Sequence, residues 1–229
     1  MRIAKLHDWH VTTAEARRLQ EELAGRLVRR PIPERIETVA GADMALSRER
    51  ELFFAAVVVL SFPGLEPLEQ IAVQAPADFP YVPGLLTFRE GPPLLDAFRR
   101  LSRAPDAVIF DGQGIAHPRR LGLAAHMGLW LGLPTVGCAK SRLIGEHGEP
   151  ARDKGAAAPL LDGGEQIGVV LRTRTGVKPV FVSPGHLADL ETSRELVLRC
   201  CGRYRLPEPT RQAHIAVGRF KEECLRGRA

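Results

Sequence analysis

The sequence predicts an α/β fold in which helices cover both faces of a mixed central sheet. A short, fully apolar run at residues 107–110 and a second predicted buried strand at 135–138 flank a helical segment at 121–133. Such alternation is typical of parallel strands joined by a crossover helix, and fully apolar strands are typical of buried sheet positions. Three longer β-rich segments precede them, at residues 36–42, 53–62 and 69–75. Pro63-Gly64 separates the last two and indicates a hairpin-connected, antiparallel portion of the sheet.

The remaining elements follow from capping and periodicity. Thr12 and Glu15 form a capping-box pattern, and leucines at helical spacing extend the first predicted helix through Arg30. Further predicted elements are a helix that ends near residue 103, strands at 167–172 and 180–182, and helices at 187–201 and 208–225. The segment 146–164 is rich in Gly, Ala and charge, so we expect an exposed excursion. Because there is no internal repeat and no dividing linker, we expect one domain over residues 1–229.

The composition bounds the compartment and the partners. Hydrophobic residues make up 45% and charged residues 26% of the chain, which argues against disorder and coiled coils. The formal net charge of +5 permits a polyanionic partner without requiring one. The four cysteines form no metal-clamp or disulfide pattern, and the longest apolar run, 52–60, is far shorter than the roughly 20 residues of a membrane span. We therefore expect a cytoplasmic protein with no membrane partner.

Carboxylates follow two of the predicted strands. Asp43 and Asp111 each close an apolar run, a position at which a buried charge is costly unless it is compensated. A divalent cation is one such partner, since Mg²⁺ takes oxygen ligands and keeps several waters. Glu90, in a turn predicted after the Pro-rich loop at 80–93, is a third candidate ligand. A helix cap or an ion pair is the alternative for each acid, and residue spacing leaves both interpretations open.

Glycines and histidines are dense in the segment after Asp111. Gly112 and Gly114 allow the backbone to approach a ligand closely, but they are equally consistent with a tight strand-to-helix turn. His117 places a titratable ring beside the positive charge of Arg119 in a predicted loop. We expect His126, by contrast, to be a half-buried helix histidine.

The loop that begins at Pro80 is stiff and apolar. Pro80 and Pro83 fix two backbone φ angles, so an exposed Tyr81 could act as a wedge that unstacks bases. The alternative is a surface loop folded onto the core. Arg89, close by in the sequence, could reach a phosphate group.

Several segments together carry a family resemblance. They are VAGAD (39–43), PYVPGLLTFREGP (80–92), DGQGIAHPR (111–119), GCAKSRLIG (137–145), SPGH (183–186) and RLPEPTRQAH (205–214). In this order, over nearly the whole chain, they resemble endonuclease V, the family of deoxyinosine-directed repair nucleases. The wedge-like loop and the DGQGIAHPR segment are the most specific parts of the match.

The resemblance implies a ribonuclease H-like fold and a DNA repair activity. It implies Mg²⁺-dependent hydrolysis, with Mn²⁺ as a substitute, of the second phosphodiester bond 3′ to a deaminated base, chiefly deoxyinosine. The products would carry 3′-hydroxyl and 5′-phosphate ends. The implied partner is DNA that contains deoxyinosine or another deaminated base, with inosine-containing RNA as a second expected substrate, and we expect the protein to act as a monomer.

Site residues are carried over from the resemblance position by position. Asp43, Glu90 and Asp111 would be the metal ligands, and Lys140 and His214 would act beside them near the scissile phosphate. The implied DNA- and lesion-binding residues are Pro80, Tyr81, Val82, Pro83, Gly84, Leu85, Arg89, Gly112, Gly114, His117, Gly137 and Ser141. Among them, glycine turns at Gly84, Gly112 and Gly137 would line the pocket for a flipped base. The chain departs from the family pattern at Ala125 and at Met44-Ala45-Leu46.

Three rival interpretations remain at this stage. The acids alone also fit another ribonuclease H-like nuclease, including an inosine-specific endoribonuclease. A non-catalytic lesion-binding protein would bind such DNA without nicking it. A small-molecule α/β enzyme is the third, although the sequence contains neither a Walker loop nor a dinucleotide-binding fingerprint.

Overall fold

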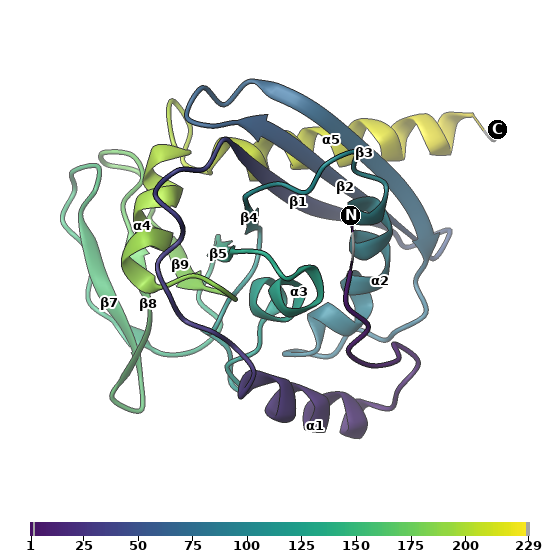
Figure 1. Ribbon diagram of the computed structural model, residues 1–229, viewed down its shortest axis with the longest axis horizontal. Helices are drawn as coiled ribbons and strands as arrows, with labels where there is room; N and C mark the ends of the chain where they lie inside the picture. The colour runs from purple at the N-terminus through teal and green to yellow at the C-terminus, as the bar shows by residue number, and fades with distance from the viewer. Residues whose placement is uncertain (2, 228–229) are drawn as a thin grey trace.

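A single nine-stranded sheet runs through the protein (Figure 1). The computed structural model describes residues 1 and 3–227. The strands lie in the order β3-β2-β1-β4-β5-β9-β8-β7-β6. They are β1 (Thr38–Ser47), β2 (Leu52–Ser61), β3 (Pro67–Pro76), β4 (Ala107–Phe110), β5 (Thr135–Ala139), β6 (Glu146–His147), β7 (Ala157–Asp162), β8 (Glu165–Leu171) and β9 (Val180–Pro184). The helices are α1 (Thr13–Ala24), α2 (Leu86–Arg99), α3 (Leu123–Leu131), α4 (Leu190–Arg199) and α5 (Glu208–Arg226).

The centre of the sheet is parallel and its flanks are antiparallel. Strands β1, β4 and β5 run parallel, whereas β2 pairs antiparallel with β1 and β9 with β5. Every residue of β4 and β5 is buried, as expected for strands covered on both faces. The mixed α/β sheet flanked by helices is therefore confirmed.

Alternation along β2 divides the core into two layers. Phe54, Ala56, Val58 and Leu60 face one layer, which is completed by apolar residues of α4 and α5. The intervening residues of β2 face the other layer, against α2 and α3. Helix α1 packs outside this second layer, where Leu23 lies against residues of α3 (Figure 1). Because helices cover both faces of the sheet, every central strand has two buried faces, and these segments are therefore continuous apolar runs in the sequence.

The N-terminal segment lies on the second layer. Trp9 stacks on Trp130, with ring centroids 4.9 Å apart, and the Nε2 atoms of His7 and His126 are 2.8 Å apart. His126 lies in a helix as expected, but it is completely rather than half buried. The N-terminal segment supplies the cover that sequence periodicity could not indicate.

Several predicted boundaries were wrong, including the end of the helix predicted near residue 103, since α2 ends at Arg99. Helix α1 ends at Ala24 rather than Arg30, because Gly25 caps it. The chain then runs beside the segment after β9, where the amide of Leu187 donates to the carbonyl of Val28. The segment 146–164 is not merely an excursion, since β6 and β7 extend the sheet by pairing with one another and with β8. Strand β1 continues past Asp43 to Ser47, because its antiparallel pairing with β2 is longer than its parallel pairing with β4.

Within residues 1 and 3–227, none of the helices combines the length and apolar character needed to cross a membrane.

Gly41 sets the distance between β1 and α5. A Cβ atom added to Gly41 would lie 2.0 Å from the backbone carbon of Pro209, at the start of α5. We expect Gly41→Ala to lower the free energy of unfolding by about 3 kcal/mol, as severe overpacking does. Urea denaturation measures this change. Gly218→Ala is the matched control, because Gly218 lies within α5 with nothing near its added Cβ and alanine should stabilise the helix by about 0.5–1 kcal/mol. Equal stability of the two variants would contradict the close approach.

Candidate active site

Strand register brings two carboxylates together at the end of the parallel strands. Ala42 of β1 pairs with Phe110 of β4, so the next residues, Asp43 and Asp111, follow on adjacent strands. Neighbouring strands are about 4.8 Å apart, which makes this a meeting point of two negative charges. Asp111 follows a strand end as predicted, whereas Asp43 lies within its strand.

Glu90 joins this pair from helix α2. The sequence places Glu90 before Gly91-Pro92-Pro93 and so predicted a turn, but α2 continues through both prolines. Much of α2 is buried against the sheet, and this packing outweighs the poor helix propensity of the prolines. Glu90 therefore stands on a rigid element rather than in a loop.

Two basic side chains contact the aspartates. The Nδ1 atom of His214, in α5, lies 2.7 Å from Oδ2 of Asp43. Lys140, directly after β5, donates from Nζ to Oδ2 of Asp111. The five residues predicted to be catalytic thus gather at one place, from the interior of β1, the ends of β4 and β5, and helices α2 and α5.

Burial and mutual repulsion shape the charges of the acids. Burial, together with the negative charges of Asp43 and Asp111, raises the pKa of Glu90 to about 8. Burial also raises the pKa of Asp43, although the hydrogen bond from His214 opposes this rise. The raised pKa values show that burial and mutual repulsion both oppose negative charge on these acids.

The donor chemistry fits a hard divalent cation, because the acids offer carboxylate oxygens. Among the described residues, however, no three His, Cys, Asp or Glu side chains converge closely enough to hold an ion as they stand. Asp43 and Asp111 instead contact His214 and Lys140. Those contacts must rearrange before the carboxylates could share an ion.

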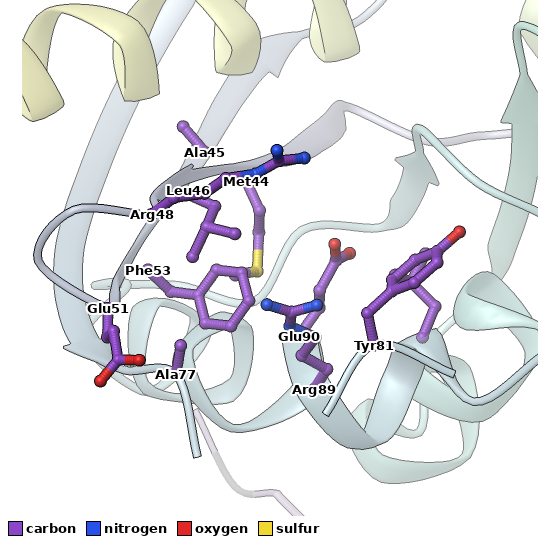
Figure 2. Close-up of a pocket in the computed structure, with 11 residues that line it drawn as sticks. Met44, Ala45, Leu46, Arg48, Glu51, Phe53, Ala77, Tyr81, Arg89 and Glu90 are labelled. Carbon is purple, nitrogen blue, oxygen red and sulfur yellow. The ribbon is translucent and has the colours of Figure 1, made fainter. Parts of the chain in front are cut away.

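Tyr81 stands between two cavities. The first, of about 610 Å³, includes Glu90, Arg89 and Phe53 in its wall, and we call it the Glu90 cavity (Figure 2). The second, of about 330 Å³, is bordered by Gly84 and Asp111, and we call it the Gly84 cavity. Tyr81 lines both cavities and is 69% exposed. The acidic cluster therefore opens on both sides of a projecting aromatic ring.

Comparison with known proteins decides the family. The family model for Endonuclease V matches residues 21–215. The chain belongs to the endonuclease V family. It is 54% identical to Endonuclease V of Gloeobacter violaceus, over 91% of this chain and 86% of that protein. A crystal structure of Endonuclease V from Streptomyces avermitilis superposes with a TM-score of 0.90 at 42% identity, covering 95% of this chain and 96% of that one.

A further similar structure contains nucleic acid. It is Endonuclease V from Ciona intestinalis in complex with a 24mer DNA containing an inosine followed by a ribo-adenosine. Its TM-score is 0.80 at 25% identity, covering 92% of this chain and 98% of that one. Membership of the family makes this chain a nuclease, and the neighbouring structures confirm the predicted fold.

Most predicted lesion-binding residues of this endonuclease V family member border one cavity. Those in the wall of the Gly84 cavity are Tyr81, Val82, Pro83, Gly84, Gly112, His117 and Ser141. Arg89 faces the Glu90 cavity instead, where its guanidinium lies 5.0 Å from the ring centroid of Phe53 and 5.9 Å from that of Tyr81 (Figure 2). Met44, Ala45 and Leu46, the departures from the family pattern, also line the Glu90 cavity, whereas Ala125 packs in the core against α1.

Four predicted residues border neither of these cavities. Pro80 faces a third cavity beside Phe79, and Leu85 is buried at the base of the loop. Gly137 packs against the backbone of Gly114, and it lies within β5 rather than in the predicted turn. Gly114 in turn packs against the backbone of Ser183 and Pro184. A Cβ on Gly137 would be 2.4 Å from the amide nitrogen of Gly114, so its role is to let this loop approach the sheet.

The loop around Tyr81 is held by a tight turn. The amide of Leu85 donates to the carbonyl of Val82 at 2.9 Å, and Gly84 has a φ of +78°. Proline and then glycine at the two central positions are typical of a type II turn, which requires positive φ at the second. The backbone of the loop is thus specified by its own sequence.

His117 supports this turn from the neighbouring loop. Its Nε2 donates to the carbonyl of Gly84 at 2.9 Å, and its Nδ1 accepts from the amide of Arg119 at 3.2 Å. Burial lowers the pKa of His117 to about 4, so the ring is neutral near pH 7. His117 therefore acts as a neutral hydrogen-bonding group rather than a positive charge.

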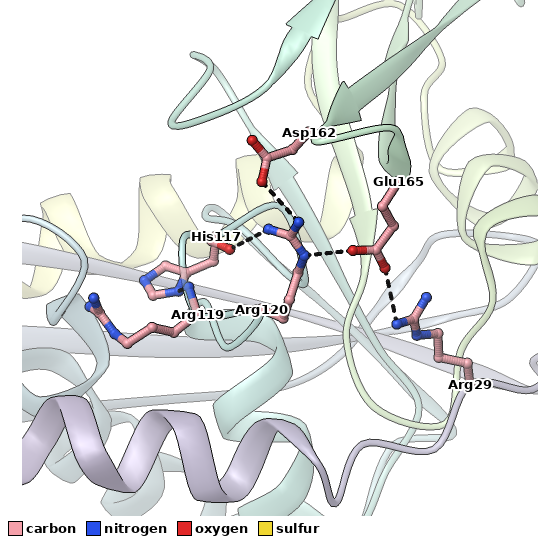
Figure 3. Close-up of polar contacts among 6 residues, drawn as sticks. All are labelled: Arg29, His117, Arg119, Arg120, Asp162 and Glu165. Carbon is pink, nitrogen blue, oxygen red and sulfur yellow. Dashed lines mark hydrogen bonds and ion pairs between the residues drawn. The ribbon is translucent and has the colours of Figure 1, made fainter.

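An ion-pair network secures the same loop from the other side. Arg120 contacts Asp162 and Glu165 of the β7–β8 hairpin, and it donates to the carbonyl of His117 at 3.1 Å (Figure 3). Glu165 also pairs with Arg29. These contacts fix the loop to the sheet beside the Gly84 cavity.

Sequence reasoning missed two residues that act through others. Gln20 of α1 donates to the carbonyl of Gly84, and Arg205 donates to the backbone carbonyl of Lys140 at 3.0 Å. Neither has a local signal, because each contact joins distant parts of the chain. The only available hint for Gln20 was a polar residue close to the apolar stripe of a predicted helix.

The depressed pKa of His117 makes a prediction about acid stability. Protonation favours the unfolded chain, in which the pKa is near 6.5, so the stability due to neutral His117 is present above pH 6.5 and lost as pH falls towards 4. The loss amounts to about 3 kcal/mol. His117→Gln should remove this part of the acid sensitivity. Urea denaturation from pH 7 to 4 measures it, and parallel stability curves for the two proteins would contradict the prediction.

Proposed function

We propose that this nuclease cleaves DNA containing deoxyinosine, using Mg²⁺, at the second phosphodiester bond 3′ to the lesion. The products carry 3′-hydroxyl and 5′-phosphate ends. The observation that carries this proposal is the cluster of Asp43, Glu90 and Asp111, which borders the cavities on either side of an exposed Tyr81. The inosine-containing DNA bound by the Ciona relative supports the choice of lesion.

The acidic residues supply the hydrolytic chemistry. Asp43, Glu90 and Asp111 would hold the cation, with Mn²⁺ able to replace Mg²⁺. When bound, such a cation neutralises phosphate charge and lowers the pKa of a coordinated water. With the carboxylates holding a cation, Lys140 and His214 would be released from Asp111 and Asp43 and would lie beside the phosphate as basic groups.

The Gly84 cavity supplies lesion recognition. A base within a duplex must leave the stack to enter it, at a cost of a few kcal/mol that is lowest for a damaged or mismatched base. Hypoxanthine presents a 6-oxo acceptor and an N1–H donor, which backbone amides and carbonyls of the glycine-containing loops in the cavity wall could pair. Tyr81 would fill the gap that the flipped base leaves, as inserted side chains do in other bent or opened duplexes.

Inosine-containing RNA is a second candidate substrate. The DNA of the Ciona complex carries a ribonucleotide directly after its inosine. A single strand also needs no opening by a wedge, so its bases are cheaper to splay into a pocket. Nicking of matched DNA and RNA strands, each with one inosine, distinguishes the two substrates.

Removing an acid tests the metal site. We expect Asp111→Asn and Glu90→Gln to lower the rate of nicking of a deoxyinosine duplex at least about 100-fold, as loss of transition-state charge stabilisation does elsewhere. Asp96→Asn is the control, because Asp96 lies on the same helix as Glu90 and pairs with Arg100 at the surface. Gel mapping of the cut with Mg²⁺, Mn²⁺ or EDTA measures the outcome. Undiminished nicking in EDTA, or in either acid variant, would refute the proposed chemistry.

Removing the aromatic ring tests the wedge. We expect Tyr81→Ala to weaken binding to a deoxyinosine duplex about 10-fold, the scale of one lost stacking contact. Metal dependence should be unchanged, since Tyr81 supplies no carboxylate oxygen to the acidic cluster. Fluorescence anisotropy with matched inosine-containing and undamaged duplexes measures the discrimination. Equal losses on both duplexes would show that Tyr81 grips DNA in general and is no wedge.

A further inference from the structure

One carbonyl oxygen beneath the wedge accepts three hydrogen bonds. The donors to the carbonyl of Gly84 are Gln20 Nε2 at 2.9 Å, His117 Nε2 at 2.9 Å and Arg119 Nη2 at 3.0 Å. A carbonyl oxygen has two lone pairs, so this oxygen is fully occupied. It serves to fix the loop and has no capacity left for a base.

Gln20 connects these groups and has no free polar atom. Its side chain is buried, with 1% of the residue exposed. Besides Gly84, its Nε2 donates to the carbonyl of Leu121 at 3.1 Å, and its Oε1 accepts from Nε of Arg119 at 2.7 Å. Helix α1 meets the rest of the molecule mainly through apolar residues such as Ala16 and Leu23.

The buried amide of Gln20 acts mainly by fixing the positions of the groups that it contacts, and adds little to stability. A satisfied internal hydrogen bond adds only about 1 kcal/mol net, and an apolar side chain of the same shape can be equally stable. Gln20, however, fixes Gly84 at the positive φ of the turn, three residues after Tyr81. Holding that backbone in place before DNA arrives removes an ordering cost from binding.

We propose that Gln20 is a positioning residue for the wedge and thereby supports cleavage of a duplex more than cleavage of a single strand. The inference rests on the proposed function, in that Tyr81 must open a duplex. Only in a duplex must the inosine be separated from a paired base before it can flip. A loosened Tyr81 should therefore slow cleavage of a duplex and have little effect on cleavage of a single strand.

The test compares two substrates in two variants. Gln20→Leu replaces the amide with an apolar side chain of similar size and removes all three of its hydrogen bonds. Leu23→Ala is the matched control, because it loosens the packing of α1 on α3 and leaves the polar contacts of Gln20 intact. The measured quantity is kcat/KM for nicking of the same inosine strand, single or annealed to its complement.

We expect Gln20→Leu to lower kcat/KM on the duplex about 10- to 100-fold, as misplacement of a supporting group does elsewhere, with less than about a 3-fold change on the single strand. Leu23→Ala should leave the ratio of the two values unchanged. Equal losses on both substrates, no loss on either, or the same selective loss in Leu23→Ala would each overturn the proposal.

A second measurement separates this inference from the proposed function. Amide hydrogen exchange of the segment 80–88 needs no substrate, and we expect it to be faster in Gln20→Leu than in the wild type or Leu23→Ala. If the wild type nicks neither strand, the proposed function fails while exchange still decides whether Gln20 holds the loop. If Gln20→Leu does not fold, Gln20→Glu replaces it, since it keeps an acceptor for Arg119 and loses the donor to Gly84.

Discussion

The structure depends on holding three carboxylates together where the parallel strands end. The register of β1 and β4 brings Asp43 next to Asp111, and Glu90 completes the cluster from α2. Repulsion and burial oppose this arrangement, as the pKa of Glu90 at about 8 shows. Only a scaffold with two fully packed faces can impose it, because an isolated hairpin or loop would relax and separate the charges. The extensive apolar core is thus a requirement of the acidic site.

Close backbone approaches deliver the remaining groups to the acids. Gly41 lets the start of α5 pack directly on β1, and the same helix carries His214 to Asp43. Gly137 lets the loop after β4 pack directly on β5, whose end carries Lys140 to Asp111. Both glycines lie a few residues from a group of the site, and the absence of a side chain lets two backbones approach closely there. They place charged groups within contact distance.

The sequence was informative where structure is local and uninformative where it is not. Apolar runs before Asp111 and Lys140 predicted buried parallel strands, and Pro83-Gly84 predicted a rigid turn, because each depends on neighbouring residues alone. Glu90 was placed in a turn because proline disfavours helices locally, yet packing of α2 on the sheet prevails. The extension of β1 beyond Asp43 required knowledge of its partner β2. The support of Gly84 by Gln20 joins residues 64 positions apart, a contact that no pattern within one segment could indicate.

The two halves of the site differ in their electrostatic character, and this difference has a functional logic. The wedge loop is held by a neutral amide, a histidine with a pKa of about 4 and a guanidinium, none of which changes charge near neutral pH. The acidic cluster, by contrast, is not preformed for its ligand, because Lys140 and His214 occupy carboxylate oxygens that the proposed cation would need. On the proposed function, lesion recognition would rest on a preformed backbone, whereas cleavage would require rearrangement of side chains. In this arrangement the base can be examined before the groups that cut the strand are assembled.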